Sequence, residues 1–374
     1  MNGNLTPSDP LQQTIRFAAA YQVLNDAIPA RAFPGCAFGV LSAGQVVLHD
    51  ALGRFTYEDD SSQVHPETIF DIASVTKVAA TTAIAMLLHQ RGQLNLDTPL
   101  GDVLPAFLAG RPQEDPAHRV QLRHLLAHNS GLPGYIEFFR TAANATDLMN
   151  ACFNLPLGAE PGARAEYSDP GFILLGKALE AILGEPLPAF TQREIFDPLA
   201  MTSTCFNPSP LIHDAIPPTE NDTTFRHRRI QGEVQDENAW LLNGAAGHAG
   251  LFSNAADLLR FAAVILNSRS KKVPRGAPGT LFKPATVKLF SKRQGPKGSP
   301  QALGWDTPSE NSSSGRHFSP RSIGHLGYSG CSLWIDLDAG IAVALLTNRT
   351  WPDRKCQLIR EVRSAFHDAV RAVL

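Results

Sequence analysis

The chain has 374 residues, 43% of them hydrophobic, which is enough for one large domain or for two that share a core. Its 33 basic and 35 acidic residues give a formal net charge of −2, so the overall charge gives no reason to expect a nucleic-acid partner. Nowhere do eighteen apolar residues run together, and we therefore expect no membrane-spanning helix.

The cysteines and the N-terminus bear on the compartment. The five cysteines are scattered and never spaced C-x-x-C, which argues against a disulfide scaffold and a zinc knuckle and suits a reducing environment. Residues 1–9 contain no basic segment that leads into an apolar run, so we expect no signal peptide and a cytoplasmic location. A periplasmic location stays open if a leader is missing from the sequence.

The first ninety residues predict a helix, a hairpin and a second helix. Apolar residues recur at helical spacing over Gln12–Ile28, and Pro29 ends that pattern. The segment Cys36–His49 alternates as a strand does and has a turn at 42–45, which predicts a β-hairpin. The run Val78–Leu88 carries no charge and is apolar on nearly every side, which is typical of a helix buried in the middle of a domain.

The middle of the chain predicts short helices. Long strand alternation is absent from residues 91–239, and helical patterns there are broken repeatedly by proline and glycine. These patterns cover Leu122–Ala127, Ala142–Phe153, Gly171–Leu183 and Phe190–Leu199. Farther on, Ala255–Leu266 predicts a helix with Ser253 as its N-cap. The basic stretch Arg269–Lys297 is rich in proline and glycine and predicts a solvated loop.

The chain ends, as it begins, with strands and a helix. Leu333–Ile335 and Ile341–Leu346 flank a hairpin turn, and Cys356–Leu374 has the spacing of an amphipathic helix. We therefore expect an α/β fold of the α+β type, in which one antiparallel sheet is built from both chain ends, flanked by terminal helices, and carries a mostly helical inserted region. The expected divisions are 1–90 with 240–374 for the α/β domain and 91–239 for the helical domain.

Ser74 and Lys77 stand at the start of the predicted buried helix, where neither residue suits packing. Their side chains share one helix face, since they are three residues apart. A helix N-terminus favours developing negative charge, and a neutral lysine beside a serine hydroxyl can take its proton. Taken alone, this spacing also fits a serine N-cap followed by a surface lysine.

Tyr167 is the second residue with a chemical use. It lies between a turn and the helix expected near Gly171. A tyrosine near a cation can relay a proton or act as a phenolate base, and we expect such a cation to lower its pKa. The structural alternative is a ring packed at a helix start, with Asp169 as the N-cap.

A glycine-rich segment, 324–330, precedes the last hairpin. Its glycines allow the backbone to approach a ligand closely. A strand at this position, if it lies beside a nucleophile, can donate a backbone N–H to an oxyanion. A simple glycine-rich bend is the alternative.

Three motifs now follow one another: Ser-x-x-Lys, Tyr-x-Asp and His-x-Gly. β-Lactamases and penicillin-binding proteins carry Ser-x-x-Lys, a polar triplet and Lys-Thr-Gly in the same order. The chain resembles this superfamily, and specifically its class C β-lactamase-like branch, which includes esterases, DD-peptidases and D-aminopeptidases. The segments 125–133, 247–253 and 303–305 fit the same branch. The resemblance extends from about Cys36 to Asn348.

The resemblance implies a serine hydrolase that needs no cofactor and cleaves an ester or amide through an acyl-enzyme. Small esters, D-amino-acid peptides and cell-wall fragments are the implied substrates. Ser74 would be the nucleophile, Lys77 its proton acceptor or the group that tunes Tyr167, and Tyr167 the residue that moves protons. The backbone N–H groups of Ser74 and Tyr328 would form the oxyanion hole. Substrate contacts are implied for Asp169, His325 and Gly327.

Two residues depart from the family pattern. Asp169 stands where many relatives have asparagine, and an ionised carboxylate cannot donate to a substrate carbonyl. It can instead pair with Lys77 or select a substrate with a free amino group. His325 stands in place of a lysine and is only partly charged near neutral pH. Both departures argue against efficient β-lactamase action. The segments Asp236–Trp240 and Gly247–Gly250 are similar to a subgroup linked to cell-wall metabolism.

Three alternatives remain open. A non-hydrolytic penicillin-recognising sensor would acylate at Ser74 and stop, whereas a true class C-type β-lactamase would turn penicillins over. A metallohydrolase is the third, because His124 and His128 have a zinc-ligand spacing. The glutamate of a zincin is missing between them, so we expect His124 to be partly exposed, His128 to be hydrogen-bonded in a turn and the protein to have no metal site. The sequence does not predict the oligomeric state.

Overall fold

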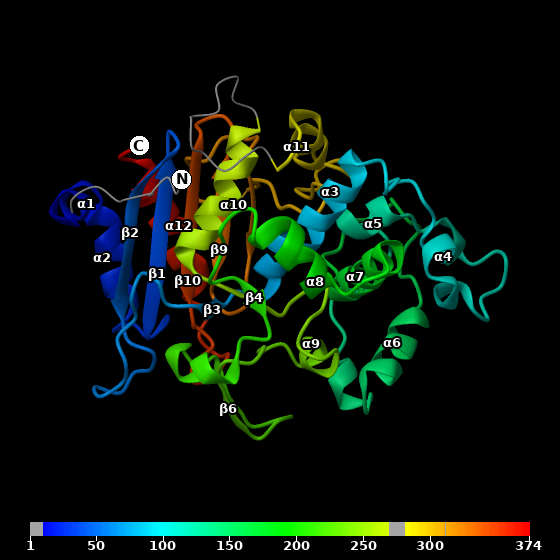
Figure 1. Ribbon diagram of the computed structural model, residues 1–374, viewed down its shortest axis with the longest axis horizontal. Helices are drawn as coiled ribbons and strands as arrows, with labels where there is room; N and C mark the ends of the chain where they lie inside the picture. Colours follow the sequence, from blue (N-terminus) through cyan, green and yellow to red (C-terminus); the bar gives the residue numbers. More distant parts are fainter. Residues whose placement is uncertain (1–9, 269–280, 311) are drawn as a thin grey trace.

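A five-stranded antiparallel sheet organises one half of the molecule (Figure 1). The computed structural model describes residues 10–268, 281–310 and 312–374. The strands lie in the order β2-β1-β10-β9-β8. Their bounds are Gly35–Ser42 (β1), Gln45–Gly53 (β2), Ile323–Leu326 (β8), Ser332–Asp336 (β9) and Ile341–Thr347 (β10).

The sheet joins the two ends of the chain. β1 pairs with β10 in an antiparallel register that runs from Cys36 opposite Thr347 to Ser42 opposite Ile341. A two-residue turn, 43–44, connects β1 to β2, and both of its residues have positive φ, as a tight hairpin turn requires. The expected α+β fold, with an antiparallel sheet made from both chain ends, is confirmed.

Helices cover both faces of this sheet, and every residue of β9 and β10 is buried. On one face lie α2 (Ala18–Ala27) and α12 (Ile359–Arg371), whose apolar residues pack with Phe38 of β1. On the other face lies α10 (Ala255–Asn267), which approaches β1 so closely that a Cβ at Gly39 would lie 2.8 Å from Leu259 Cδ1. Strands covered on both faces need apolar residues at successive positions, which explains why β10 shows no alternation.

The expected N-terminal helix is divided. Two helices, α1 (Pro10–Arg16) and α2, replace the single helix predicted over Gln12–Ile28. They meet at Phe17, whose backbone has φ −102° and ψ 22° and whose ring is buried beneath the sheet. Apolar spacing continues across the junction, so periodicity alone does not reveal it.

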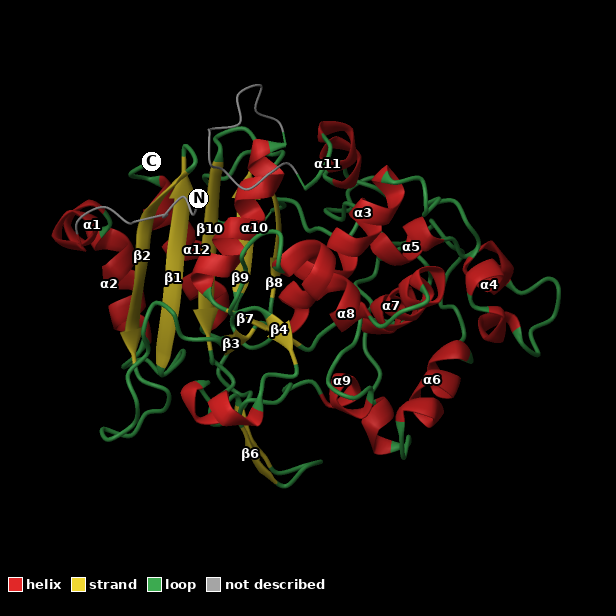
Figure 2. Cartoon of the chain, in the orientation of Figure 1, coloured by secondary structure: helices red, strands yellow, loops and turns green. Residues whose placement is uncertain are grey.

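Most of the remaining helices gather on the side away from the sheet (Figure 2). The expectation of a mostly helical region is confirmed, while its exact boundaries stay a prediction. The helices are α3 (Ala83–Gln90), α4 (Leu100–Val103), α5 (Leu122–Leu126), α6 (Ala145–Phe153), α7 (Asp169–Leu183), α8 (Leu187–Thr191), α9 (Glu237–Leu241) and α11 (Pro284–Phe290). Short strands form two small sheets, β3 (Phe70–Asp71) with β7 (Leu251–Ser253) and β4 (Cys205–Phe206), and β5 (Glu220–Asp222) with β6 (Arg228–Ile230).

Three local predictions differ from the structure. The N-cap of α10 is Asn254, because Ser253 is the last residue of β7. The helix predicted over Phe190–Leu199 is instead α8 followed by a π-helical segment, 192–196. Part of the basic stretch expected to be a solvated loop forms α11, which buries Phe290; residues 269–280 of that stretch lie outside the described residues.

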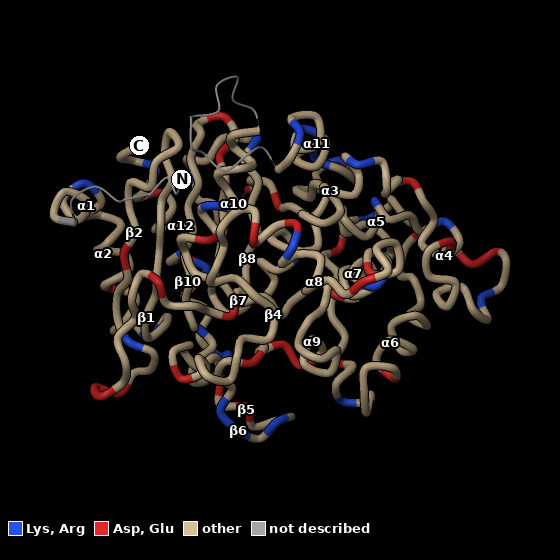
Figure 3. Tube along the Cα trace, viewed as in Figure 1, with Lys and Arg blue, Asp and Glu red and all other residues tan. Residues whose placement is uncertain are grey.

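Charge is spread over the molecule rather than gathered on one face. Acidic and basic residues are interspersed along the described chain (Figure 3), as the small net charge suggests. Among the described helices, none combines the length and the apolar composition that a bilayer crossing requires.

Candidate active site

Ser74 stands in a bend that a buried carboxylate holds in place. Asp71, at the end of β3, is 2% exposed. Its Oδ1 accepts a hydrogen bond from the backbone N–H of Ala73 (2.8 Å), and its Oδ2 accepts one from that of Gln235 (2.7 Å). Ala73 has φ 46°, in the left-handed region that residues with a side chain rarely adopt. The following 3-10 turn places Ser74 at the wall of a cleft. Such over-determined strain clusters at functional sites.

The Lys77 ammonium is fully buried behind Ser74 and uses all three of its N–H groups. Nζ donates to Ser74 Oγ (3.0 Å), to Asp169 Oδ1 (2.6 Å) and to the backbone oxygen of His248 (3.1 Å). An ammonium group has three donors, so each has an acceptor here. The ion pair with Asp169 offsets the cost of burying the charge. Of the two roles left open for Asp169, the geometry therefore shows the pair with Lys77.

Helix α7 brings Asp169 to this position. Its N-cap is Ser168, whose Oγ accepts a hydrogen bond from the backbone N–H of Gly171 (3.0 Å). The helix therefore begins at Asp169, two residues earlier than expected, and Asp169 is its first residue rather than its cap. The positive end of the helix dipole favours the ionised carboxylate at that point.

Tyr167 places its ring beside the lysine. Lys77 Nζ lies 4.9 Å from the ring centroid, and the phenol is hydrogen-bonded to Ser74. Burial of the phenol, followed by the negative charge of Asp169, raises the pKa of Tyr167 well above its usual value, although 38% of the residue is exposed to the cleft. The expectation that a nearby cation lowers this pKa is wrong, because burial raises it and the negative charge of Asp169 raises it further. The phenol is neutral in the resting site.

The chain that follows β8 lies against the backbone just before Ser74. A Cβ at Gly327 would lie 2.4 Å from the carbonyl oxygen of Ile72, so no side chain fits there. The Gly327 N–H donates to the Cys331 carbonyl (2.7 Å) and fixes the bend that leads to Tyr328. In the described part of the chain, no acceptor takes the backbone N–H of Ser74 or of Tyr328. Two free N–H groups of this kind suit the stabilisation of an oxyanion.

His325 lies within β8 and is only 2% exposed. Its Nδ1 shares a 2.8 Å hydrogen bond with the carbonyl oxygen of Leu326, which can only accept, so Nδ1 carries the proton. Burial lowers the pKa of His325, and the imidazole is therefore neutral at neutral pH. The expectation of a partly charged group needs correction, since this side chain offers no cation to a substrate carboxylate.

One cleft of about 1010 Å³ brings the predicted residues together. Lys77 lies directly behind its wall, in hydrogen-bond contact with Ser74. The predicted residues that line the cleft are Ser74, Tyr167, Asp169, His325, Gly327 and Tyr328.

The two histidines with zinc-ligand spacing have local roles. His124 Nδ1 accepts a hydrogen bond from the backbone N–H of Gln121 (3.0 Å), and His128 Nδ1 accepts one from that of Ser168 (3.0 Å). His124 is partly exposed, as expected, whereas His128 is buried and stacks on Phe172. Both rings therefore support the turns around the site.

A family profile described as Beta-lactamase matches residues 17–365, which is nearly the whole chain. The chain belongs to the β-lactamase family. Its named relatives include an amidase and a carboxypeptidase, and it is a β-lactamase-related serine hydrolase.

Three known proteins illustrate this β-lactamase-family membership. The chain is 29% identical over 358 residues to the N-acetylmuramyl-L-alanine amidase of Bacillus subtilis (strain 168), covering 86% of this chain and 78% of that one. It is 28% identical over 389 residues to a provisionally named D-alanyl-D-alanine carboxypeptidase of Escherichia coli (strain K12), covering 89% and 87%. The solved structure of EstCE1, described as a hydrolase with promiscuous acyltransferase activity, has a TM-score of 0.74 at 23% identity and covers 96% of this chain and 100% of that one, which shows the fold.

Sequence reasoning assigned no role to Asp236 and His248 of this β-lactamase-family hydrolase, although both lie in segments that it compared with a subgroup of the family. Besides holding Lys77 through its backbone oxygen, His248 donates from Nε2 to Asp236 Oδ1 (2.9 Å). The same oxygen caps α9 by accepting from the Ala239 N–H (2.7 Å). Burial opposes ionisation of Asp236, but His248, this N–H and Lys77 outweigh it and lower the pKa to about 2. Asp236 is therefore ionised at the cleft wall.

Proposed function

We propose that this protein hydrolyses amide bonds in cell-wall peptides through an acyl-enzyme on Ser74. The observation that carries the proposal is a Ser74 hydroxyl held between a buried ammonium, Lys77, and a phenol, Tyr167. The printed names of the amidase and carboxypeptidase relatives both refer to amide bonds that involve alanine, and this supports the substrate class. A cleft of about 1010 Å³ is large enough for a peptide rather than a small ester alone.

Acylation is proposed to run as a proton relay, because the resting phenol is neutral. Ser74 Oγ attacks the amide carbon while its proton passes to Tyr167 Oη, and the phenol's own proton passes to the leaving nitrogen. The Oγ–C bond forms and the C–N bond breaks. The proton that Ser74 Oγ loses is gained by Tyr167 Oη, and the proton that Oη loses is gained by the leaving nitrogen. The backbone N–H groups of Ser74 and Tyr328 stabilise the oxyanion of the tetrahedral intermediate.

In this scheme Lys77 works as a fixed positive charge. Its ammonium lies 3.0 Å from Ser74 Oγ and favours the negative charge that grows on that oxygen during attack. Asp169 holds the ammonium in place through the 2.6 Å ion pair. Deacylation reverses the relay, with water donating to Tyr167 Oη and the phenol returning a proton to Ser74.

The test is a covalent adduct followed by turnover. The protein is incubated with a muramyl peptide, a D-alanyl-D-alanine peptide, p-nitrophenyl esters and benzylpenicillin, and the intact mass and the released product are measured together. We expect a transient adduct on Ser74 and product release with at least one peptide. An adduct that never turns over indicates the penicillin-recognising sensor instead, and rapid turnover of penicillin alone indicates a true β-lactamase.

We also propose a reducing, cytoplasmic location. All five cysteines are free, and Cys36, Cys152 and Cys331 are buried among apolar residues. A protein that meets an oxidising compartment more often pairs its cysteines. Fractionation of cells that carry the full gene, with detection of the protein in each fraction, tests this location.

A further inference from the structure

The acidic side chains that line the cleft differ in whether a lysine or arginine forms an ion pair with them. Glu137 pairs with Arg140 (2.5 Å), Asp169 with Lys77 (2.6 Å) and Glu237 with Arg354 (2.5 Å). Within the described residues, no lysine or arginine forms an ion pair with either of the other two carboxylates that line the cleft. These two are Asp236 and Asp306.

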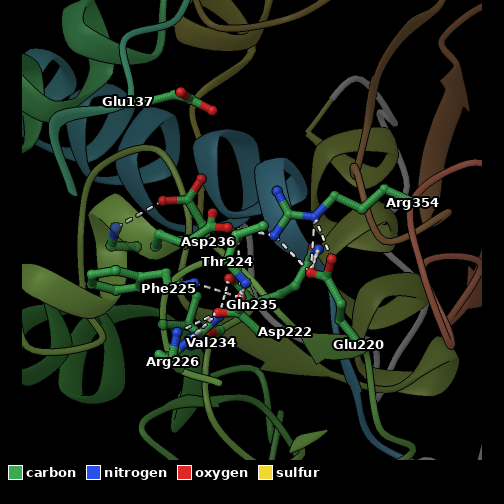
Figure 4. A network of polar contacts seen from close by, with 12 residues as sticks. Glu137, Glu220, Asp222, Thr224, Phe225, Arg226, Val234, Gln235, Asp236 and Arg354 are labelled. Atoms are coloured by element: carbon green, nitrogen blue, oxygen red, sulfur yellow. Dashed lines mark hydrogen bonds and ion pairs between the residues drawn. The ribbon is translucent and has the colours of Figure 1, made fainter. Parts of the chain in front are cut away.

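Asp236 has one carboxylate oxygen to spare. Both of its hydrogen bonds, from His248 Nε2 and from the backbone N–H of Ala239, go to Oδ1. Figure 4 shows this side chain above the network of charged residues, with one carboxylate oxygen bonded and the other carrying no dashed line. The side chain is 21% exposed and lines the cleft. Oδ2 is therefore an available acceptor at the cleft wall.

The position of this oxygen is fixed relative to the nucleophile. The residue before Asp236, Gln235, donates its backbone N–H to Asp71, the carboxylate that holds the bend at Ser74. On the other side, Asp236 bonds to His248, whose backbone oxygen accepts from Lys77. Two independent connections thus tie the carboxylate to the catalytic groups. Recognition of a substrate group at a set distance from the scissile bond needs this kind of rigidity.

Asp306 differs from Asp236 in two ways. It accepts a hydrogen bond from Gln301 Nε2 (2.8 Å), and its backbone bridges to Gly324 at the sheet edge of the cleft. Among the residues that the structure describes, no connection of the kind found for Asp236 ties Asp306 to Lys77 or to the bend at Ser74. We therefore take Asp236 as the acidic group that a substrate meets beside the nucleophile.

We propose that Asp236 Oδ2 binds a substrate ammonium group, so that the site prefers amides whose acyl part carries a free amine. An ionised carboxylate can only accept hydrogen bonds, and an ammonium is the donor that gains most from it, because both partners are charged. Glu137 and Glu237 line the same cleft, but their carboxylates are already paired with Arg140 and Arg354. This inference rests on the proposed function and names the substrate class of that site.

The test compares matched pairs of p-nitroanilides: D-alanine p-nitroanilide with its N-acetyl form, and Nα-acetyl-D-lysine p-nitroanilide with its Nε-acetylated form. We expect kcat/KM of the wild-type protein to favour the free amine by about 10- to 100-fold in at least one pair, as one charge-assisted hydrogen bond allows. The preference should fade above the pKa of the amine. In Asp236→Asn it should fall to about 1- to 3-fold, because kcat/KM for the free-amine probe should drop much further than kcat/KM for the acetylated probe.

Glu137→Gln is the matched control, because this carboxylate lines the same cleft but already has Arg140 as its partner; its preference should equal that of the wild-type protein. Asp236→Ser, which keeps an N-cap oxygen for α9, is a second variant if Asp236→Asn does not fold. The inference is overturned if the preference is unchanged in Asp236→Asn, or if kcat/KM falls equally for both members of a pair. Asp236 would then only support His248. Turnover of the acetylated probe that survives Ser74→Ala overturns the proposed function instead.

Discussion

Lys77 Nζ and Asp169 Oδ1 lie 2.6 Å apart, and Asp169 holds the only carboxylate that forms an ion pair with this ammonium in the described chain. The resemblance to the family implies an asparagine at the position of Asp169, and an aspartate there would change the charge beside Ser74. The three N–H groups of Lys77 donate to Ser74, Asp169 and His248, which leaves this nitrogen no lone pair to take a proton from Ser74. Proton transfer from Ser74 then needs another carrier, and the geometry leaves Tyr167 for that task.

Asp169→Asn should therefore change the reactivity of the site more than the fold of the protein. The substitution removes the counter-ion of Lys77 and adds an amide donor that a substrate carbonyl can use. We expect acylation by benzylpenicillin to rise, while hydrolysis of p-nitrophenyl acetate survives. Stopped-flow acylation rates and intact mass after mixing measure both.

The thermal stability of Asp169→Asn must be measured alongside its activity. Removing one member of a buried ion pair can destabilise a protein by roughly 3–5 kcal/mol. The comparison is therefore made below the lower Tm of the two proteins. If acylation by penicillin is unchanged while both proteins are fully folded, the ion pair does not limit penicillin recognition and the argument from the missing asparagine is wrong.

Ser74→Ala should abolish turnover of every substrate found and leave the fold intact. The methyl group fits where the hydroxymethyl group stood, and loss of a covalent nucleophile costs about three or more orders of magnitude in rate. Ser309→Ala, which removes a hydroxyl from the same cleft, is the control and should keep wild-type activity. Near-normal turnover in Ser74→Ala would exclude the acyl-enzyme assignment.

Tyr167→Phe should harm amides more than activated esters. An amide nitrogen needs a proton to leave, whereas p-nitrophenolate leaves without one, so the relay through the phenol matters most for amides. We expect a loss of about 10²- to 10⁴-fold for a peptide and a smaller loss for p-nitrophenyl acetate. Equal losses would point to a phenolate base, and kcat/KM of the wild-type protein would then rise with pH toward the phenol pKa.

Small activated esters should be better substrates than penicillins. They have good leaving groups and need neither the missing asparagine contact nor a cation at residue 325. The neutral His325, with its lowered pKa, cannot supply the charge that a lysine gives a penicillin carboxylate. Steady-state kinetics with p-nitrophenyl butyrate and benzylpenicillin decide the matter, and a higher kcat/KM for the penicillin would refute this ranking.

The contribution of His367 to the stability of the protein should fall as the pH drops from 6.5 to 4. Burial lowers the pKa of His367, on α12, from 6.5 to about 4, so the unfolded chain binds a proton in this range that the folded one does not. This contribution is complete above pH 6.5 and declines by roughly 3 kcal/mol on acidification. Urea denaturation at several pH values should show a shallower slope for His367→Gln, whereas the exposed His317→Gln should keep the wild-type slope.

The sequence alone was sufficient for the fold class and for the order of the site residues. Strand alternation and helical spacing are local properties, so they predicted the hairpin at β1 and β2 and the buried helix after Ser74. The Ser-x-x-Lys spacing also constrains two side chains within one helical turn, and the structure shows Lys77 bonded to Ser74. Local patterns missed the break at Phe17 and the true N-cap, Asn254, because packing and strand pairing decide those boundaries.

Only the tertiary structure decided the charges of the side chains at the site. Asp169 is far from Lys77 in the sequence, and only the docking of α7 on the buried helix brings their atoms to 2.6 Å. Burial, together with the charge of Asp169, raises the pKa of Tyr167 instead of lowering it, and burial, together with the charge of Lys77, lowers the pKa of His325. The free oxygen of Asp236 likewise exists only because His248 and α9 occupy its other oxygen. Protonation depends on desolvation and on charges brought close by folding, and a linear pattern contains neither.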